Sequence, residues 1–177
     1  MWNFSKIVLD ALVAAGWREC RHIDISPVVE LLVQSGFTAH SAARAFLAEF
    51  GDLRVRSTVT DGDYVWGHWA DFDVPAALQW IEPRDQQTLH RLFGPGLCPI
   101  GETGGGSLWI SEKSEVIGEY LIYDTATRSR SVEEAFEALF TCRNPAYETH
   151  VLHDDGARVE VSIAPWARGE ETSASKP

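Results

Sequence analysis

The six histidines include two that lie close together in the sequence, and imidazole can bind a metal ion or transfer a proton. His150 and His153 stand three residues apart with Asp154 beside them, and imidazole and carboxylate are groups that bind Zn²⁺. Residues three apart on a strand point to opposite faces, so this spacing favours ordinary polar residues near a turn. His40 precedes Ser41, but a Ser–His dyad needs a third orienting group, and adjacency in sequence does not give facing geometry. We therefore predict no metal site, no cofactor and no catalytic residues.

Three consecutive glycines, Gly104 to Gly106, raise the possibility of a phosphate cradle. The Walker form of that cradle ends in Gly-Lys-Ser/Thr and leads into a helix. Here Ser107 follows with no lysine, and Leu108 and Ile110 then alternate with polar or amphipathic residues as on a strand. The pattern favours a tight turn between two strands, with an anion site as the alternative.

The three cysteines, Cys20, Cys98 and Cys142, are far apart and form no CxxC pair. Neither a zinc site nor a disulfide framework is indicated, and a reducing cytoplasm fits this usage best. Cys98 precedes Pro99 on an expected buried strand, where a cysteine is more often a small core residue than a nucleophile.

Charge and aromatic residues are concentrated in one segment. Residues 1–60 carry six basic and six acidic side chains, whereas residues 61–85 carry six acids against Arg84 alone. The acids of that segment are Asp61, Asp63, Asp71, Asp73, Glu82 and Asp85, and its large aromatics are Tyr64, Trp66, Trp69 and Trp80. Aromatic anchors among acids are typical of an interface that meets a basic partner. The predicted partner-binding residues are Asp61, Asp63, Trp66, Trp69, Asp71 and Asp73. The alternative is that the tryptophans belong to the core and the acids to a solvated loop.

The whole chain has a net charge of −11. This opposes non-specific nucleic-acid binding, which depends on Lys and Arg neutralising phosphates. It permits electrostatic steering toward a basic partner, although acidity can also serve solubility alone. No apolar run approaches the roughly 20 residues of a membrane span, and the N-terminus lacks the pattern of a signal peptide. We expect a cytoplasmic protein.

The periodicity of apolar residues, together with the residues that begin and end helices and strands, predicts the secondary structure of the chain. Apolar residues at helical spacing predict a helix over 4–15 that Gly16 ends, and a second that begins with Ser26 as N-cap and Pro27 in its first turn and ends at Gly36. They also predict helices over 39–50 with Thr38 as cap, and from Pro83 to Gly94. A short helical turn is expected from Asp73 toward Trp80. The box formed by Ser131 and Glu134 predicts a last helix. Alternation predicts strands over 53–59, 63–69, on both sides of Gly104, over 116–123, and in a final hairpin of 150–153 with 158–163.

This order of elements predicts an α+β fold with a mainly antiparallel central sheet flanked by helices. Residues 1–168 are expected to form a single domain, and residues 169–177 a disordered tail.

Four segments, in order, resemble one known family. They are Ala15-Gly16-Trp17-Arg18-Glu19-Cys20-Arg21, the stretch Ala42–Leu53 with its "fL.efG.L" pattern, Cys98-Pro99-Ile100-Gly101-Glu102, and Ser131–Leu139. Together they resemble the SUKH superfamily, specifically its third subgroup. The resemblance spans residues 10–141 and leaves 145–177 unmatched.

The resemblance implies a cytoplasmic bacterial immunity protein that binds and neutralises a cognate toxin domain, often a nuclease or deaminase, of a polymorphic or contact-dependent toxin system. It also implies an α+β fold with a central mixed sheet surrounded by helices, and it carries over no catalytic residues. Two alternatives stay open: an enzyme or binding protein for a small molecule, using a cleft near Gly104–Gly106, and a regulatory adaptor that binds a host protein.

Overall fold

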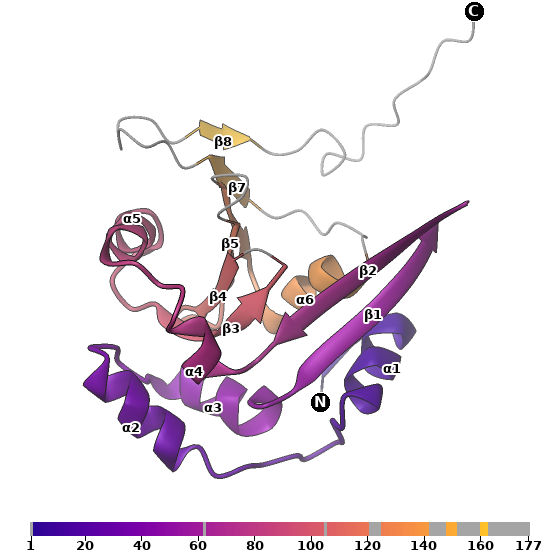
Figure 1. Cartoon of the computed structure of the whole chain (residues 1–177), viewed down its shortest axis with the longest axis horizontal. Coiled ribbons are helices and arrows are strands. Elements are labelled where there is room, and N and C mark those ends of the chain that lie inside the picture. Colours follow the sequence, from indigo (N-terminus) through magenta and orange to yellow (C-terminus); the bar gives the residue numbers. More distant parts are fainter. Residues whose placement is uncertain are drawn as a thin grey trace, which may run out of the picture.

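The computed structural model of the chain describes residues 2–61, 63–104, 106–120, 125–141, 148–151 and 160–162. Eight strands of this described part form one sheet, and their order in space is their order in the sequence (Figure 1). The strands are β1 (Arg54–Asp61), β2 (Tyr64–Asp71), β3 (Cys98–Thr103), β4 (Gly106–Ile110), β5 (Val116–Tyr120), β6 (Thr125–Ser129), β7 (Glu148–Val151) and β8 (Glu160–Ser162). Every pairing between them is antiparallel.

The α+β fold and the antiparallel sheet are therefore confirmed. The mixed sheet that the family resemblance implied is wrong for the strands described, because every neighbouring pair is antiparallel, including β2–β3 and β6–β7, whose connections contain helices. The alternating pattern predicted β1, β2, β3, β4 and β5, but it missed β6, whose sequence Thr-Ala-Thr-Arg-Ser has little apolar character.

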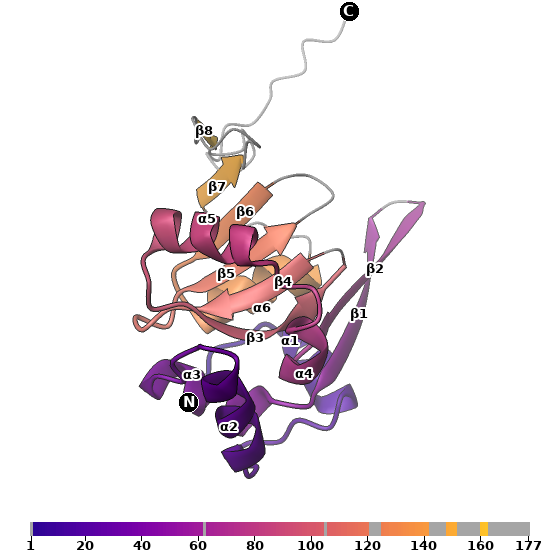
Figure 2. The same cartoon turned by 60° about the vertical axis from the view of Figure 1, so that its left-hand side comes forward.

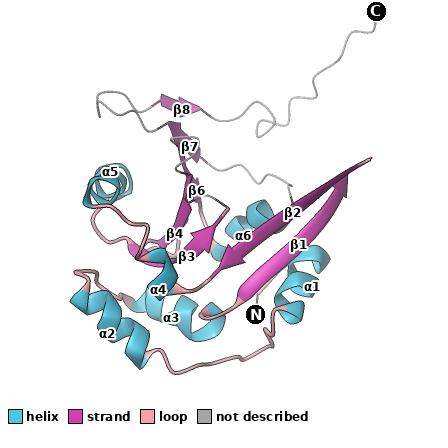
Figure 3. Cartoon of the chain, viewed as in Figure 1, coloured by secondary structure: helices cyan, strands magenta, loops and turns pink. Residues whose placement is uncertain are grey.

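The helices are α1 (Lys6–Ala14), α2 (Ser26–Gln34), α3 (Ser41–Phe50), α4 (Val74–Ala77), α5 (Pro83–Phe93) and α6 (Val132–Thr141). Figure 2 shows α5 in front of the central strands and α6 behind them, so each face of the sheet has its own cover. Helices α1 and α6 also pack against β1, and α4 packs against β3. Figure 3 shows that strands β1 and β2, together called the β1–β2 arm, reach beyond the helices.

The core on the α6 side is built from stacked and edge-on aromatic rings. The ring of Phe50 lies 5.1 Å, between centroids, from the rings of both Phe46 and Phe136. Phe72, directly after β2, lies 5.4 Å from Phe136. These four side chains come from α3, α6 and the end of β2, and all are buried. Burying such rings is the largest single source of apolar area available to the chain.

Two predicted helix caps are wrong. His40, not Thr38, begins α3, because its Nδ1 accepts a hydrogen bond from the backbone N–H of Ala43 at 3.3 Å. Ser26 is already the first residue of α2, and Ile25 precedes the helix without a side-chain cap. The predicted cap of α6 is confirmed: Ser131 accepts from the N–H of Glu134 at 3.2 Å.

Several predictions fall on residues outside the described part. These are the turn of the final hairpin with His153 and Asp154, residues 121–123 of the predicted strand, Cys142, and the tail 169–177. The strands of that hairpin are confirmed where they are described, since β7 pairs with β8 from Thr149↔Ser162 to Val151↔Glu160. No helix within the described ranges combines the length and the apolar character needed to cross a membrane.

Candidate functional site

The β1–β2 arm separates the predicted partner-binding residues into two groups. Strands β1 and β2 pair along eight residues, from Arg54↔Asp71 to Asp61↔Tyr64, whereas β2 pairs with β3 only at Ala70↔Thr103 and Asp71↔Glu102. From Trp69 toward the tip, the described residues of β2 do not pair with β3, so this part of the arm diverges from the rest of the sheet. A strand rises about 3.3 Å per residue, so the arm's two ends lie roughly 25 Å apart.

Asp61, Asp63 and Trp66 belong to the outer part of the arm, and Trp69, Asp71 and Asp73 to its base. Asp63 is exposed at the tip, while the side chains of Asp61 and Trp66 lie outside what the structure describes. The base group is the one that the fold brings together with other side chains.

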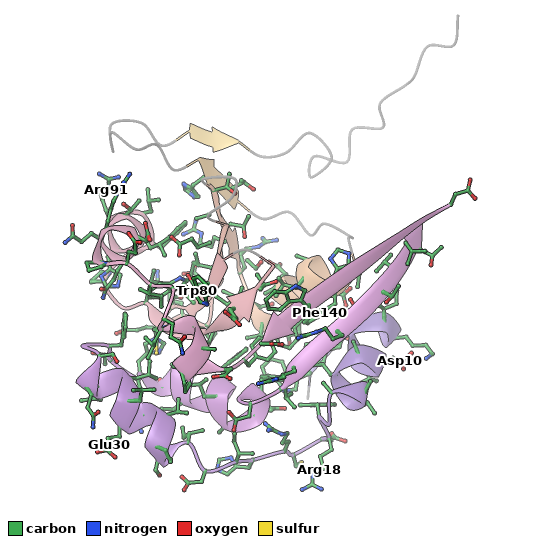
Figure 4. The ribbon with its side chains drawn as sticks, in the orientation of Figure 1. Asp10, Arg18, Glu30, Trp80, Arg91 and Phe140 are labelled. Atoms are coloured by element: carbon green, nitrogen blue, oxygen red, sulfur yellow. The ribbon has the colours of Figure 1, made fainter. Side chains whose placement is uncertain are left out.

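A cleft of about 370 Å³ lies at the base of the arm. Its lining comes from β2, α4 and the following loop, β3 and β4, and consists of Trp69, Ala77, Trp80, Glu102, Thr103, Gly106 and Ser107. We call it the Trp69–Trp80 cleft. Trp80 is 65% exposed, which is unusual for so large an apolar side chain. Figure 4 shows Trp80 beside the central strands, on the side of α5.

Trp69 is held in place by its neighbours. The Cζ atom of Arg56 lies 5.1 Å from the centroid of the Trp69 ring, a cation–π contact across the β1–β2 pair. Thr103 on β3 donates its hydroxyl to the backbone oxygen of Trp69 at 2.5 Å. Trp69 therefore belongs to the last part of β2 that is still hydrogen-bonded to β3.

Two of the predicted acids already have partners within the chain. Asp71 accepts from Arg56 through both carboxylate oxygens, at 2.5 and 3.1 Å, and this hydrogen bonding raises the pKa of Arg56. Asp73 begins α4 by accepting from the N–H of Ala76 at 3.0 Å, and it lies 3.8 Å from Arg54. Both carboxylates thus help to build the base of the arm.

Glu102 is different, and the sequence prediction did not include it. Among the described residues its carboxylate forms no hydrogen bond or ion pair, although it is only half-buried at the cleft wall. Burial raises its pKa, and the nearby charges of Asp71 and Asp73 raise it further against the opposing effect of Arg54. No local pattern in the sequence identifies Glu102, because its position depends on the pairing of Glu102 with Asp71 across β2 and β3.

A buried polar network lies beneath the cleft. Ser107, which lines the cleft, donates its hydroxyl to Oε2 of Glu119 at 2.5 Å and accepts from the indole N–H of Trp109 at 2.9 Å. Glu119 is only 2% exposed, and its other oxygen, Oε1, has no hydrogen-bond partner in the described part of the chain. Burial raises the pKa of Glu119, with the hydrogen bond from Ser107 acting in the opposite direction.

The groups considered for catalysis do not converge on this cleft. His40 uses both ring nitrogens, since Nδ1 caps α3 and Nε2 lies 3.3 Å from the backbone oxygen of Ile110. Cys98 is fully buried, and burial raises the pKa of its thiol to about 12, which keeps it protonated. Within the described ranges, no three His, Cys, Asp or Glu side chains are grouped as metal ligands would be.

The glycine run forms the hairpin that the sequence favoured. Thr103 pairs with Gly106, so β3 and β4 are joined by two residues. Gly104 is exposed, and a Cβ there would meet the indole nitrogen of Trp69 at 3.5 Å, an ordinary contact. The turn thus lies directly beside the cleft and forms part of its surroundings.

The motifs that resemble the SUKH pattern have structural roles here. The guanidinium of Arg21 donates to the backbone oxygens of Glu49 and Gly51, at 2.6 and 2.8 Å. A Cβ at Gly51 would lie 2.5 Å from the oxygen of Leu47, and one at Gly101 would lie 2.4 Å from the oxygen of Asp71. Arg21 and Gly51 thus hold the end of α3 in place. Gly101 allows β3 to lie close to the chain after β2.

Comparison with known proteins agrees with this reading of the motifs. The model of the SUKH-3 immunity protein family matches residues 4–141, which include all the helices that the structure describes and strands β1 to β6. No curated protein and no solved structure matches the chain. Because the family model covers most of the sequence, the chain belongs to the SUKH-3 immunity protein family.

Proposed function

We propose that this protein acts in the bacterial cytoplasm, where it binds and neutralises one toxin domain of a polymorphic or contact-dependent toxin system. The observation that carries the proposal is the SUKH-3 family match over residues 4–141. Immunity of this kind requires a stable complex and no chemistry by the inhibitor. The separation of His40 and Cys98 from the cleft fits a binding protein.

We further infer that the toxin acts on nucleic acids and has a basic surface. The net charge of −11 supports this, because an acidic inhibitor is steered toward a basic partner and competes with phosphates for the same cations. Blocking the toxin's active-site cleft, or a surface beside it, would then exclude the substrate. Complex formation should weaken as the salt concentration rises.

The β1–β2 arm and its base are the surface that we propose for toxin binding. It includes the predicted residues Asp61, Asp63, Trp66, Trp69, Asp71 and Asp73. The projecting shape of the arm supports this choice, since it makes a surface accessible to a partner (Figure 1). Replacing Trp66 or Trp69 by alanine should weaken toxin binding by about 2 kcal/mol if either is an anchor. Unchanged affinity in both variants, with the fold intact, would move the site elsewhere.

A protection assay tests the function directly. Each toxin domain encoded beside this gene is expressed in a sensitive cell, with and without this protein, and survivors are counted. Rescue by this chain, and not by another SUKH-3 protein expressed to the same level, is the expected result. Failure to rescue from any neighbouring toxin, together with failure to co-purify with one, would contradict the proposal.

Binding of a small molecule is the second candidate, and the Trp69–Trp80 cleft is the observation in its favour. A volume of about 370 Å³ lies within the range of small-ligand pockets, and the cleft adjoins the Gly104 turn. Thermal unfolding in the presence of fractionated cell metabolites tests this reading. A saturable stabilisation that Trp80→Ala abolishes would favour it over toxin binding.

A regulatory adaptor is the remaining alternative. The gene of such an adaptor would not lie beside a toxin gene.

A further inference from the structure

We propose that the Trp69–Trp80 cleft receives one arginine side chain of the toxin, with Glu102 as the carboxylate that pairs with its guanidinium. The inference rests on the proposed toxin-binding function and gives it a specific anchor. It also narrows the proposed binding surface to one pocket, whose residues Trp69, Trp80 and Glu102 can be tested individually.

The shape of the cleft fits a side chain rather than a whole domain surface. Its volume of about 370 Å³ is small, and it is bounded by two indoles with Glu102 at the wall. Long side chains that enter such a pocket between aromatic rings are typical anchors of protein interfaces. Trp80 is mostly exposed in the free protein, so a partner would remove apolar surface from water there.

The charges around the cleft select a cation. Arg56 forms an ion pair with Asp71, and Arg54 lies 3.8 Å from Asp73. Glu102 forms no ion pair in the described part of the chain, although the charge of Arg54 acts on it. An anionic ligand would face all three acids, and an apolar side chain would desolvate Glu102 without compensation. A cation would instead favour the charged form of that carboxylate and oppose the effects that raise its pKa.

The chain itself already contains a guanidinium that contacts both an indole ring and a carboxylate. Arg56 lies over the ring of Trp69 and forms two hydrogen bonds with Asp71. A planar guanidinium can stack on indole and bind a carboxylate through two N–H groups together, whereas an ammonium group cannot do both. The cleft shares Trp69 with this arrangement and adds Trp80 and the carboxylate of Glu102. This is why arginine fits better than lysine.

Affinity measurements on the intact toxin complex provide the first test. Glu102→Gln and Trp80→Ala should each weaken binding about 30-fold or more, because each removes half of a buried interaction. Glu30→Gln, which removes the same charge from the exposed face of α2, should change affinity by no more than about twofold (Figure 4). Val33→Ala on that helix is the apolar control, since Val33 is 61% exposed.

Arginine variants of the toxin identify the inserted residue. Each surface arginine of the toxin is changed to glutamine and combined with Glu102→Gln. One arginine should lose its effect in the presence of Glu102→Gln, because the two changes remove the same interaction. If the wild-type complex forms and both cleft variants bind within about threefold of it, the inference is overturned while the proposed function stands. A wild-type chain that binds no toxin overturns the function instead.

A titration without any toxin tests the cleft independently. The indole N–H signals of Trp69 and Trp80, assigned with Trp→Phe variants, are followed by NMR as N-acetyl-arginine amide is added. They should shift with millimolar saturation, and they should not shift with the uncharged citrulline analogue or in Glu102→Gln. Equal shifts with arginine and citrulline analogues, or no shift in the millimolar range, would overturn the inference.

Discussion

The guanidinium of Arg21 lies 2.6 Å from the backbone oxygen of Glu49, and this contact joins the first loop of the chain to the end of helix α3. Its second nitrogen binds the oxygen of Gly51. The last carbonyl groups of a helix lack partners within it and carry a partial negative charge, so a cation is well placed there. Arg21, in the first of the segments that resemble the SUKH family, therefore has a structural role: it attaches this loop to the end of α3.

The first prediction concerns that contact. Arg21→Ala should lower the free energy of unfolding by about 2 kcal/mol, because it leaves two half-buried carbonyl oxygens without a charged donor. Urea denaturation measures the change, and Arg18→Ala, which removes an exposed arginine from the same loop, is the control. A loss no larger than that of the control would show that water replaces Arg21 at little cost.

The second prediction concerns the close approach of β3 to the end of β2. A Cβ at Gly101 would lie 2.4 Å from the oxygen of Asp71 and 2.9 Å from Cα of Phe72, both of them backbone atoms. Gly101→Ala should therefore destabilise the fold by about 3 kcal/mol, since the strands must move apart. It should also disturb the Trp69–Trp80 cleft, which both strands line.

Gly67→Ala is the matched control for that variant. A Cβ at Gly67, on β2, would meet no atom within 4 Å. This substitution should leave stability unchanged or raise it by about 0.5 kcal/mol, because alanine restricts the unfolded chain. Similar losses in the two variants would mean that the strand, and not the contact between strands, determines the cost.

Local signals in the sequence were sufficient for most elements. Gly16 and Gly36 end the first two helices at positive φ, as their positions predicted, and the Gly104 run forms the reversal between β3 and β4. Helix α6 begins at the predicted box of Ser131 and Glu134. Each of these depends on residues only a few positions apart, which periodicity and capping rules can read.

The site depended on contacts between distant segments, which such rules do not contain. Glu102 lines one cleft with Trp69 and Trp80 because β3 pairs with the base of β2 and because α4 packs against β3. Likewise, His40 replaces Thr38 as a cap with support from Ile110, which is 70 residues away. Composition marked the acidic segment but could not assign its residues to the tip and the base of the β1–β2 arm.

The third prediction uses Glu119, whose pKa is raised by burial. Because its folded pKa exceeds the unfolded value, the folded state binds more protons, and stability falls as the pH rises from about 4.5 through the folded pKa. Glu119→Gln removes this dependence. The variant should gain stability relative to the wild type as the pH increases, whatever its stability at low pH.

Urea unfolding of both proteins between pH 4 and pH 8 checks this, because this range begins near the ordinary pKa of a glutamate. Glu112→Gln is the control, since Glu112 is exposed and lies in the loop after β4. Parallel stability curves for the wild type and Glu119→Gln would contradict the prediction. They would indicate that the hydrogen bonds from Ser107 and its surroundings fully offset the burial of the carboxylate.

The fourth prediction separates the two acids that face each other across β2 and β3. Asp71 is engaged by Arg56, which is about half exposed, so Asp71→Asn should cost about 1 kcal/mol of folding stability. Glu102 has no such partner among the described residues, and Glu102→Gln should stay within about 0.5 kcal/mol of the wild type. Toxin affinity should show the opposite order, with Glu102→Gln the more damaging change. Affinity loss in Asp71→Asn without loss of stability would instead mean that the toxin competes for Asp71 and displaces Arg56.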